Sequence, residues 1–181
     1  MFNIRLLSII LFAMFFALNV SAQRKVRKPI GYGASAIYNF QAEGIGADLR
    51  VRIPTPVNNL YVVPEISYYP PFNRYHELYA GGALQYDVLR IRSYNLYLLG
   101  AAYYNFWINA DDFAPEGKKK HNFAPEAGGG LVRNRGCWRP FIENRYDFKW
   151  KEDNLQIGIY YYPGQCRKNT RREKCPTVKG I

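Results

Sequence analysis

Apolar and polar positions alternate along much of the chain, and the alternation is clearest between Tyr94 and Ile108. The even positions from Leu96 onwards are apolar or small, or carry an aromatic ring. The odd positions from Asn95 to Asn105 are mixed and rich in tyrosine. Successive side chains of a strand point to opposite faces, so one face of this segment is apolar. At about 3.3 Å per residue and a tilt of about 45°, the segment is long enough to cross a bilayer as a strand.

Seven further segments show the same alternation and predict seven more strands. They are residues 31–40, 47–53, 60–69, 78–89, 127–133, 138–150 and 155–162. The segments between them contain Gly, Pro and Asn and predict turns, and the longest predicted loop covers residues 110–125. Pro64 interrupts the third strand, and because proline cannot donate to a strand ladder we expect a β-bulge there.

Eight alternating segments with no helical one predict an all-β sandwich or barrel. The apolar faces decide between them, because they place aromatic side chains near strand ends, as the interfacial girdles of a membrane barrel require. These side chains are Tyr38, Phe40, Tyr68, Phe106, Trp138 and Trp150. We therefore predict an all-β transmembrane antiparallel up-and-down β-barrel of about eight strands. A secreted sandwich is the alternative.

The polar faces of the predicted strands carry charges of both signs. An eight-stranded barrel has an interior just wide enough for side chains, so these charges would lie in the lumen. Unpaired charges there would be costly, and we expect them to pair and to plug the barrel. The predicted lumen network consists of Asp48, Arg50, Arg52, Glu65, Asp87, Glu143, Arg145, Asp147 and Lys149. A narrow gated channel is the alternative.

The first residues have the features of a signal peptide. A short basic start ending at Arg5 precedes the apolar stretch Leu6–Leu18, and Val20–Ala22 supplies small residues before a cleavage site. We divide the chain into a signal peptide (1–22), an outer-membrane barrel (23–163) and a basic periplasmic tail (164–181). The formal net charge of +11 would suit nucleic-acid binding, but export argues against a nucleic-acid partner.

Basic residues gather near both ends of the predicted mature chain. An even number of strands brings both ends to one side of the membrane, which we take to be the periplasm. The predicted basic periplasmic patch consists of Arg24, Lys25, Arg27, Lys28, Arg167, Lys168, Arg171, Arg172 and Lys174. Such a rim suits phospholipid headgroups or an acidic envelope protein, and a solvated flexible tail is the alternative. Outer-membrane lipid, lipopolysaccharide and other envelope proteins are therefore the expected partners.

Three cysteines in an exported chain leave one without an intramolecular partner. Cys166 and Cys175 bracket a short polar segment and form a possible disulfide. Cys137 would then be free, or could pair with either of the others, because spacing does not decide connectivity.

Three segments carry a resemblance to a known class of proteins: Val20–Gln23 at the cleavage site, Arg139–Tyr146 before the last predicted hairpin, and Leu155–Tyr162. In these segments the chain resembles the small eight-stranded outer-membrane β-barrel proteins of the OmpA/OmpX type, particularly those of Bacteroidetes-like bacteria. The resemblance implies a location in the outer membrane of a Gram-negative bacterium. Many such barrels end at an aromatic residue of the last strand, whereas here a basic tail follows Tyr162.

Catalytic chemistry has one candidate residue. The small-barrel enzymes that modify lipid A use a histidine with a serine and an acid near the outer rim. Only His76, beside Glu77 and near Ser67, offers that combination, and no family signature surrounds it. We expect no cofactor and no metal site. The predicted function is a non-enzymatic structural or accessory subunit, for example of an outer-membrane assembly or secretion complex. An outer-leaflet lipid-modifying enzyme is the alternative.

Overall fold

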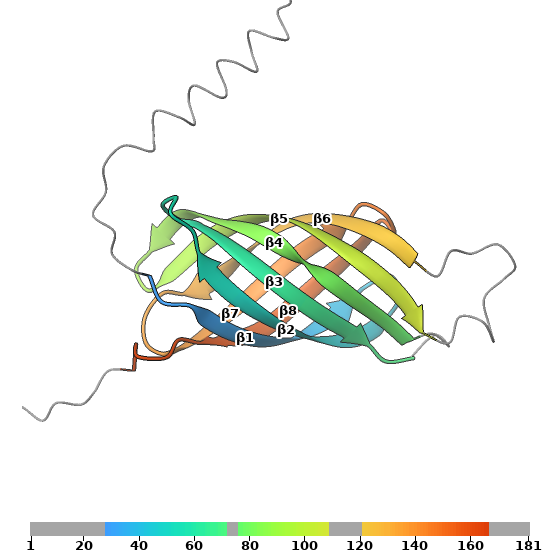
Figure 1. Cartoon of the computed structure of the whole chain (residues 1–181), viewed down its shortest axis with the longest axis horizontal. Coiled ribbons are helices and arrows are strands. Elements are labelled where there is room, and N and C mark those ends of the chain that lie inside the picture. The colour runs from blue at the N-terminus through green and yellow to red at the C-terminus, as the bar shows by residue number, and fades with distance from the viewer. Residues whose placement is uncertain (1–27, 72–75, 109–120, 167–181) are drawn as a thin grey trace, which may run out of the picture.

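Eight antiparallel strands close into a barrel in which each strand pairs with its neighbours along the chain (Figure 1). The computed structural model describes residues 28–71, 76–108 and 121–166. The strands are β1 (Gly31–Asn39), β2 (Gly44–Pro54), β3 (Leu60–Tyr69), β4 (His76–Ile91), β5 (Tyr94–Ile108), β6 (His121–Arg133), β7 (Trp138–Asp147) and β8 (Glu152–Tyr161). β8 returns to pair with β1, where Ala34 lies opposite Ile159. The predicted up-and-down barrel is confirmed, and the sandwich is excluded.

Several strand predictions need correction. β2 and β8 each begin three residues earlier than predicted. β6 begins at His121, so the last part of the predicted long loop is strand. β7 ends at Asp147, and the chain turns over residues 148–151 instead of continuing to Trp150. Pro64 lies opposite Gly82 in an unbroken register, so the bulge expected there is absent from the β3–β4 ladder. The missing N–H of Pro64 is therefore tolerated without an inserted residue.

The two ends of the barrel differ in the segments that they carry. Residues 28–30 and 162–166 lie at the same end, on the left in Figure 1, and we call it the terminal end. The connections at this end are short: residues 55–59, 92–93 and 134–137. We call the opposite end the loop end. No helix within the described ranges has the length and apolar composition needed to span a bilayer.

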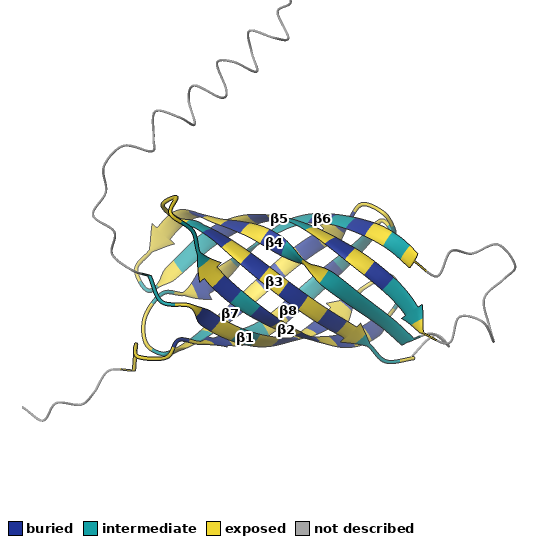
Figure 2. Cartoon of the chain, viewed as in Figure 1, coloured by how far each residue is buried: buried dark blue, intermediate teal, exposed yellow. Residues whose placement is uncertain are grey.

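Side-chain burial alternates along the barrel strands, most regularly in β2, β3 and β7, and Figure 2 shows the resulting checkerboard of buried and exposed positions. Most of the exposed positions are apolar: Leu49 is 63% exposed, Leu98 58% and Ile157 58%. The buried positions include charged residues such as Arg145, which is 1% exposed. This is the reverse of a soluble protein, and it matches a barrel with an apolar outer wall and a polar lumen.

Aromatic side chains gather on the outer wall near both barrel ends. At the loop end, Tyr38 packs edge-on against Phe40, and Tyr146 against Phe148, with ring centroids 5.1 and 5.3 Å apart. At the terminal end, Trp138 packs against Tyr161 at 4.8 Å. Trp150 departs from the prediction, because it lies in the β7–β8 turn and stacks on Trp107. The two groups of rings lie where interfacial girdles are expected.

A break in register near the terminal end of β4 changes which side chains face the lumen. Asp87 pairs with Tyr97, but the next paired residue is Leu89, opposite Leu96, so Val88 is an inserted bulge residue. Asp87 is buried, whereas Val88 and Leu89 are both exposed on the outer wall. A bulge re-aims the residues beyond it. Arg90 lies opposite Asn95 and therefore is on the lumen-facing side of β4. In a regular strand, without the bulge, Arg90 would be on the outer side.

Glycines in β6 make room for a tyrosine that crosses the lumen. Gly128, Gly129 and Gly130 lie opposite Leu99, Leu98 and Tyr97 of β5. A Cβ on Gly130 would lie 2.7 Å from the Tyr97 hydroxyl, and a Cβ on Gly128 would collide with the Asn144 carbonyl oxygen. The run of small residues thus lets the Tyr97 ring lie against β6 and reach β7.

Candidate functional site

Two arginines and two glutamates form a ring of ion pairs in the middle of the lumen. Both guanidinium ends of Arg145 bond Glu65 at 2.9 Å, and Arg145 also pairs with Glu143. Arg50 pairs with Glu143 at 3.1 Å and approaches Glu65 at 3.5 Å. Each glutamate therefore bridges both arginines. We call these four residues, together with Asp48, the central network; Asp48 bonds the Arg50 Nε at 2.6 Å.

Neutral side chains complete the hydrogen bonding of the central network. The Tyr97 hydroxyl donates to Glu143 at 2.6 Å, and the Gln85 amide donates to the same oxygen at 3.2 Å. Arg145 donates to the Tyr103 hydroxyl, Arg50 donates to Gln156, and Ser35 donates to Asp48. Taking an ion out of water costs several kcal/mol, and good geometry with further hydrogen bonds is what offsets that cost. The network meets both conditions.

The structure distributes the nine predicted lumen charges unequally. Asp48, Arg50, Glu65, Glu143 and Arg145 form the central network, and Arg52 and Asp87 pair with each other near the terminal end. Asp147 is buried at the loop end, where the backbone amides of Lys149 and Trp150 donate to it. The prediction was wrong for Lys149. Because β7 ends at Asp147, Lys149 falls in the turn and is exposed.

Sequence analysis missed several residues of the lumen. Glu126 is buried and lies 3.5 Å from Arg145, but the sequence interpretation placed the neighbouring Pro125 in a loop. Gln85, Gln156, Tyr97 and Tyr103 carry no charge and were not selected. Their position on the polar phase of predicted strands was the available signal.

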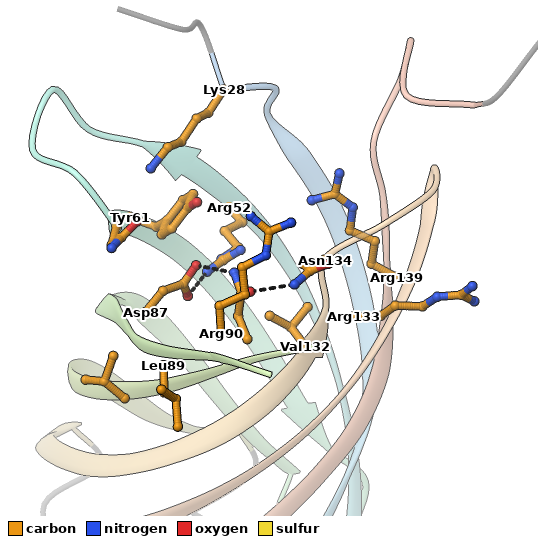
Figure 3. Close-up of a pocket in the computed structure, with 13 residues that line it drawn as sticks. Lys28, Arg52, Tyr61, Asp87, Leu89, Arg90, Val132, Arg133, Asn134 and Arg139 are labelled. Carbon is orange, nitrogen blue, oxygen red and sulfur yellow. Dashed lines mark hydrogen bonds and ion pairs between the residues drawn. The ribbon is translucent and has the colours of Figure 1, made fainter. Parts of the chain in front are cut away.

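A pocket of about 330 Å³ opens at the terminal end of the lumen (Figure 3). We call it the mouth pocket. Its charged lining residues are Lys28, Arg52, Asp87, Arg90, Arg133 and Arg139. In Figure 3 the guanidinium groups of Arg90 and Arg139 extend toward the opening, whereas Arg133 points away from it. Among the described residues, Arg52 forms a salt bridge with Asp87. The other four cationic side chains of the lining, those of Lys28, Arg90, Arg133 and Arg139, form none within the described part of the chain.

A chain of hydrogen bonds supports one wall of the mouth pocket. Arg52 pairs with Asp87 at 2.6 Å and lies over the Tyr61 ring at 3.6 Å. Asn95 donates to Asp87 at 2.7 Å, and the amides of Asn95 and Asn134 are 2.8 Å apart. These contacts connect β2, β4, β5 and the β6–β7 turn around the opening.

A disulfide joins the β6–β7 turn to the segment after β8 at the same end of the barrel. Cys137 in the β6–β7 turn is bonded to Cys166 beyond β8, with the two Cα atoms 4.6 Å apart. The possible Cys166–Cys175 bond is thereby corrected. Pairing of Trp138 with Tyr161 brings residues 137 and 166 together across the β7–β8 ladder. Next to the disulfide, the Arg139 guanidinium lies 4.0 Å from the Tyr162 ring centre, and its Nε donates to the Gly136 carbonyl.

Of the residues in the predicted basic patch, the structure describes one, Lys28. Lys28 lines the mouth pocket, with its Nζ 5.3 Å from the centre of the Tyr61 ring. Arg24, Lys25, Arg27, Arg167, Lys168, Arg171, Arg172, Lys174 and Cys175 lie outside the described residues, as does the predicted signal peptide.

Carboxylates with neutral partners occupy the loop end. Glu77 accepts hydrogen bonds from Tyr79 at 3.0 Å and Asn105 at 2.9 Å, and Glu152 accepts one from Asn39 at 2.7 Å. With the cationic mouth pocket at the terminal end, the lumen has opposite charge at its two ends. No grouping of His, Cys, Asp and Glu among the described residues is suited to hold a metal ion.

His76 does not meet the residues proposed to act with it. It is the first residue of β4 and is hydrogen-bonded through Nδ1 to the Tyr68 hydroxyl, with the two rings stacked. Tyr68 is exposed on the outer wall, whereas Ser67 is buried on the lumen side. Ser67 and His76 are therefore on opposite sides of the barrel wall.

The barrel is similar to solved structures of other β-barrels. A designed transmembrane β-barrel matches with a TM-score of 0.52 at 17% identity, covering 75% of this chain and 97% of the design. The chain has the fold of a transmembrane β-barrel. The N-terminal barrel domain of Pseudomonas aeruginosa OprF matches with a TM-score of 0.53 at 11% identity, over 73% of this chain and 95% of that domain. No protein-family description and no curated protein sequence matches the chain.

Proposed function

We propose that the chain is a non-enzymatic integral protein of the outer membrane that serves as a structural or accessory subunit of an envelope complex. An assembly or secretion complex is the expected setting. The barrel would anchor the subunit in the membrane, and the basic segments at its terminal end would contact partner proteins in the periplasm.

The filled lumen is the observation that carries this proposal. The central network spans the barrel, and aromatic side chains fill the space beside it, including Tyr97, Phe141 and Tyr160. A barrel of eight strands has little interior volume beyond that occupied by its own side chains. A plugged barrel favours an anchoring role over transport.

The lengths of the connections support an orientation with both termini in the periplasm. Barrels of this type have short periplasmic turns and longer external loops. Here the connections at the terminal end run from two to five residues, at 92–93, 134–137 and 55–59. The longest connection, residues 109–120, belongs to the loop end. The cationic side chains around the mouth pocket would then face the periplasm.

A pull-down from outer membranes tests the proposal. An affinity tag inserted within residues 109–120 leaves both termini native, and a non-ionic detergent preserves complexes. We expect a fixed, stoichiometric set of envelope proteins to accompany the wild-type chain. A variant that ends at Cys166 keeps the disulfide but lacks residues 167–181, and it should remain in the membrane and lose those proteins.

Two results would contradict the proposal. The wild-type barrel could be recovered alone, with the heated and unheated protein migrating differently on a gel as a folded barrel does. Alternatively, the same proteins could accompany the truncated variant and an unrelated tagged barrel at equal levels, which would identify them as contaminants.

A further inference from the structure

We propose that the mouth pocket binds a phosphate group. The pocket is a formed cavity of about 330 Å³ at the terminal end of the lumen, near the lower limit for ligand sites. That volume suits a small anionic group and not a folded element of a partner. The proposal is independent of the subunit role, because it concerns a ligand and not a protein partner.

The charge of the lining favours an anion of high charge. Besides Arg133, which points away from the opening, four cationic side chains and one carboxylate line the pocket, which leaves an excess of three positive charges. Asp87 is already paired with Arg52, so the excess lies on Lys28, Arg90 and Arg139. A phosphate monoester carries roughly −1.5 to −2 charges near neutral pH, and arginine donates to phosphate oxygens in parallel pairs.

Two of these arginines, Arg90 and Arg139, are positioned at the opening by different local features of the structure. The bulge at Val88 shifts the phase of β4 and turns Arg90 toward the lumen side. On β7, Arg139 donates to the Gly136 carbonyl and lies over the Tyr162 ring. Without the bulge, Arg90 would share the phase of the outer wall. A regular strand would therefore have sent this charge toward the lipid.

The buried neighbours explain why the site would be preorganised. Arg52 is fixed by Asp87, by the Gln85 side chain at 3.1 Å and by the face of Tyr61. Asn95 donates to Asp87 and accepts a hydrogen bond from Asn134, which extends this cluster to the β6–β7 turn. Cations that are already held in place lose little side-chain entropy on binding, and this strengthens the interaction.

Two sources could provide the same chemistry. One is the headgroup of a phospholipid in the adjoining leaflet, and the other is a soluble phosphorylated compound. We would measure both by calorimetric titration of the mature protein in dodecyl maltoside, a detergent without phosphate, at about 100 mM salt, which screens non-specific attraction over about 10 Å. The probes are pyrophosphate and dihexanoylphosphatidylglycerol, and hexaglutamate serves as an acidic-peptide probe.

The expected result is saturable one-to-one binding of at least one phosphate probe. The variant R90Q/R139Q should bind it roughly tenfold or more weakly, because charge-assisted hydrogen bonds are removed. The matched control R92Q/R135Q removes the same charge from turns at the same end, outside the pocket lining, and should stay within about twofold of wild type. Binding of both phosphate probes would identify a soluble ligand, and binding of the lipid alone would identify the headgroup.

Three results would overturn the proposal. They are the lack of saturable binding of either phosphate probe to the wild-type protein, equal losses in the two double variants, and tighter binding of hexaglutamate than of both phosphate probes. Gel migration before and after heating checks that each variant is folded. If R90Q/R139Q does not fold, the single variants R90Q and R139Q decide, each with an expected loss of at least about threefold.

Discussion

Arg145 and Glu65 form a bidentate ion pair across the lumen, with Nη1–Oε1 and Nη2–Oε2 distances of 2.9 Å each. Arg145 is on β7 and Glu65 on β3, and three strands separate β3 from β7 in either direction around the barrel. The pair therefore connects opposite walls. It adds a direct contact across the lumen to the ladder that joins neighbouring strands.

Removal of Arg145 should destabilise the barrel strongly. In R145A, the buried carboxylates of Glu65 and Glu143 lose a shared cation, and breaking one partner of a buried pair costs about 3–5 kcal/mol. Urea unfolding of protein refolded in lipid vesicles measures the loss. The control R135A removes an exposed arginine from the β6–β7 turn and should change stability by less than about 0.5 kcal/mol. Equal stability of the two variants would show that the lumen pairs are dispensable.

The Tyr97 hydroxyl should contribute measurably to the same network. Y97F removes the donor that lies 2.6 Å from Glu143, and hydrogen bonds to charged groups contribute about 1.5–3 kcal/mol. The remaining donors Gln85 and Arg50 reduce the loss, so we expect a value at the lower end. Y104F serves as the control, because Tyr104 is exposed on the outer wall of the same strand. Identical unfolding midpoints for the two variants would show that the Tyr97 hydroxyl does not stabilise the barrel.

Replacing two different strand glycines with alanine distinguishes the effect of close packing from the effect of strand propensity. G128A should lower stability by about 1–3 kcal/mol or prevent closure, because its Cβ would meet the Asn144 carbonyl of the neighbouring strand. G100A should be tolerated, because nothing lies within 4 Å of a Cβ at that position. The folded fraction after refolding, read from unheated gel mobility, compares the two directly. A folded G128A protein with wild-type stability would contradict the packing described for β6.

Cysteine connectivity gives a chemical test of the terminal end. Peptide mapping without reduction should recover a fragment in which Cys137 is joined to Cys166, while Cys175 reacts as a free thiol or joins another chain. The disulfide closes a loop with a sequence separation of 29, and reducing it should lower stability by a few kcal/mol. A fragment joining Cys166 to Cys175 would contradict the structure of this end.

The sequence predicted the parts of the fold that depend on period-two alternation. The faces of β5 follow the predicted pattern, with Tyr97 and Tyr103 buried and Leu98 exposed. The alternation of apolar and polar residues continues beyond the end of β7 into the following turn, however. For that reason Lys149 was included in the predicted lumen network, although the strand ends at Asp147. The start of β6 was missed because the residues up to Pro125 were assigned to the long loop.

Other features depend on relationships between strands that a linear pattern does not contain. The bulge at Val88 is visible only from the register of β4 against β5. Cys137 and Cys166 meet because β7 and β8 form a hairpin, whereas the closer pair in sequence, Cys166 and Cys175, seemed the simpler choice. The charges of the central network were candidates from the sequence, whereas their partners follow from the closure of the barrel.

Depth-dependent fluorescence quenching tests the lipid-facing wall most directly. Single cysteines replace the outward residues of β5 from Tyr94 to Ile108 in a C175S background, which retains the Cys137–Cys166 disulfide. Each is labelled with a small fluorophore before refolding into vesicles that contain brominated lipid. We predict the strongest quenching near Gly100 and weaker quenching toward Tyr94 and Ile108, with none at a control label on Arg135 in the β6–β7 turn. Uniformly unquenched labels along β5 would contradict a barrel that spans the membrane.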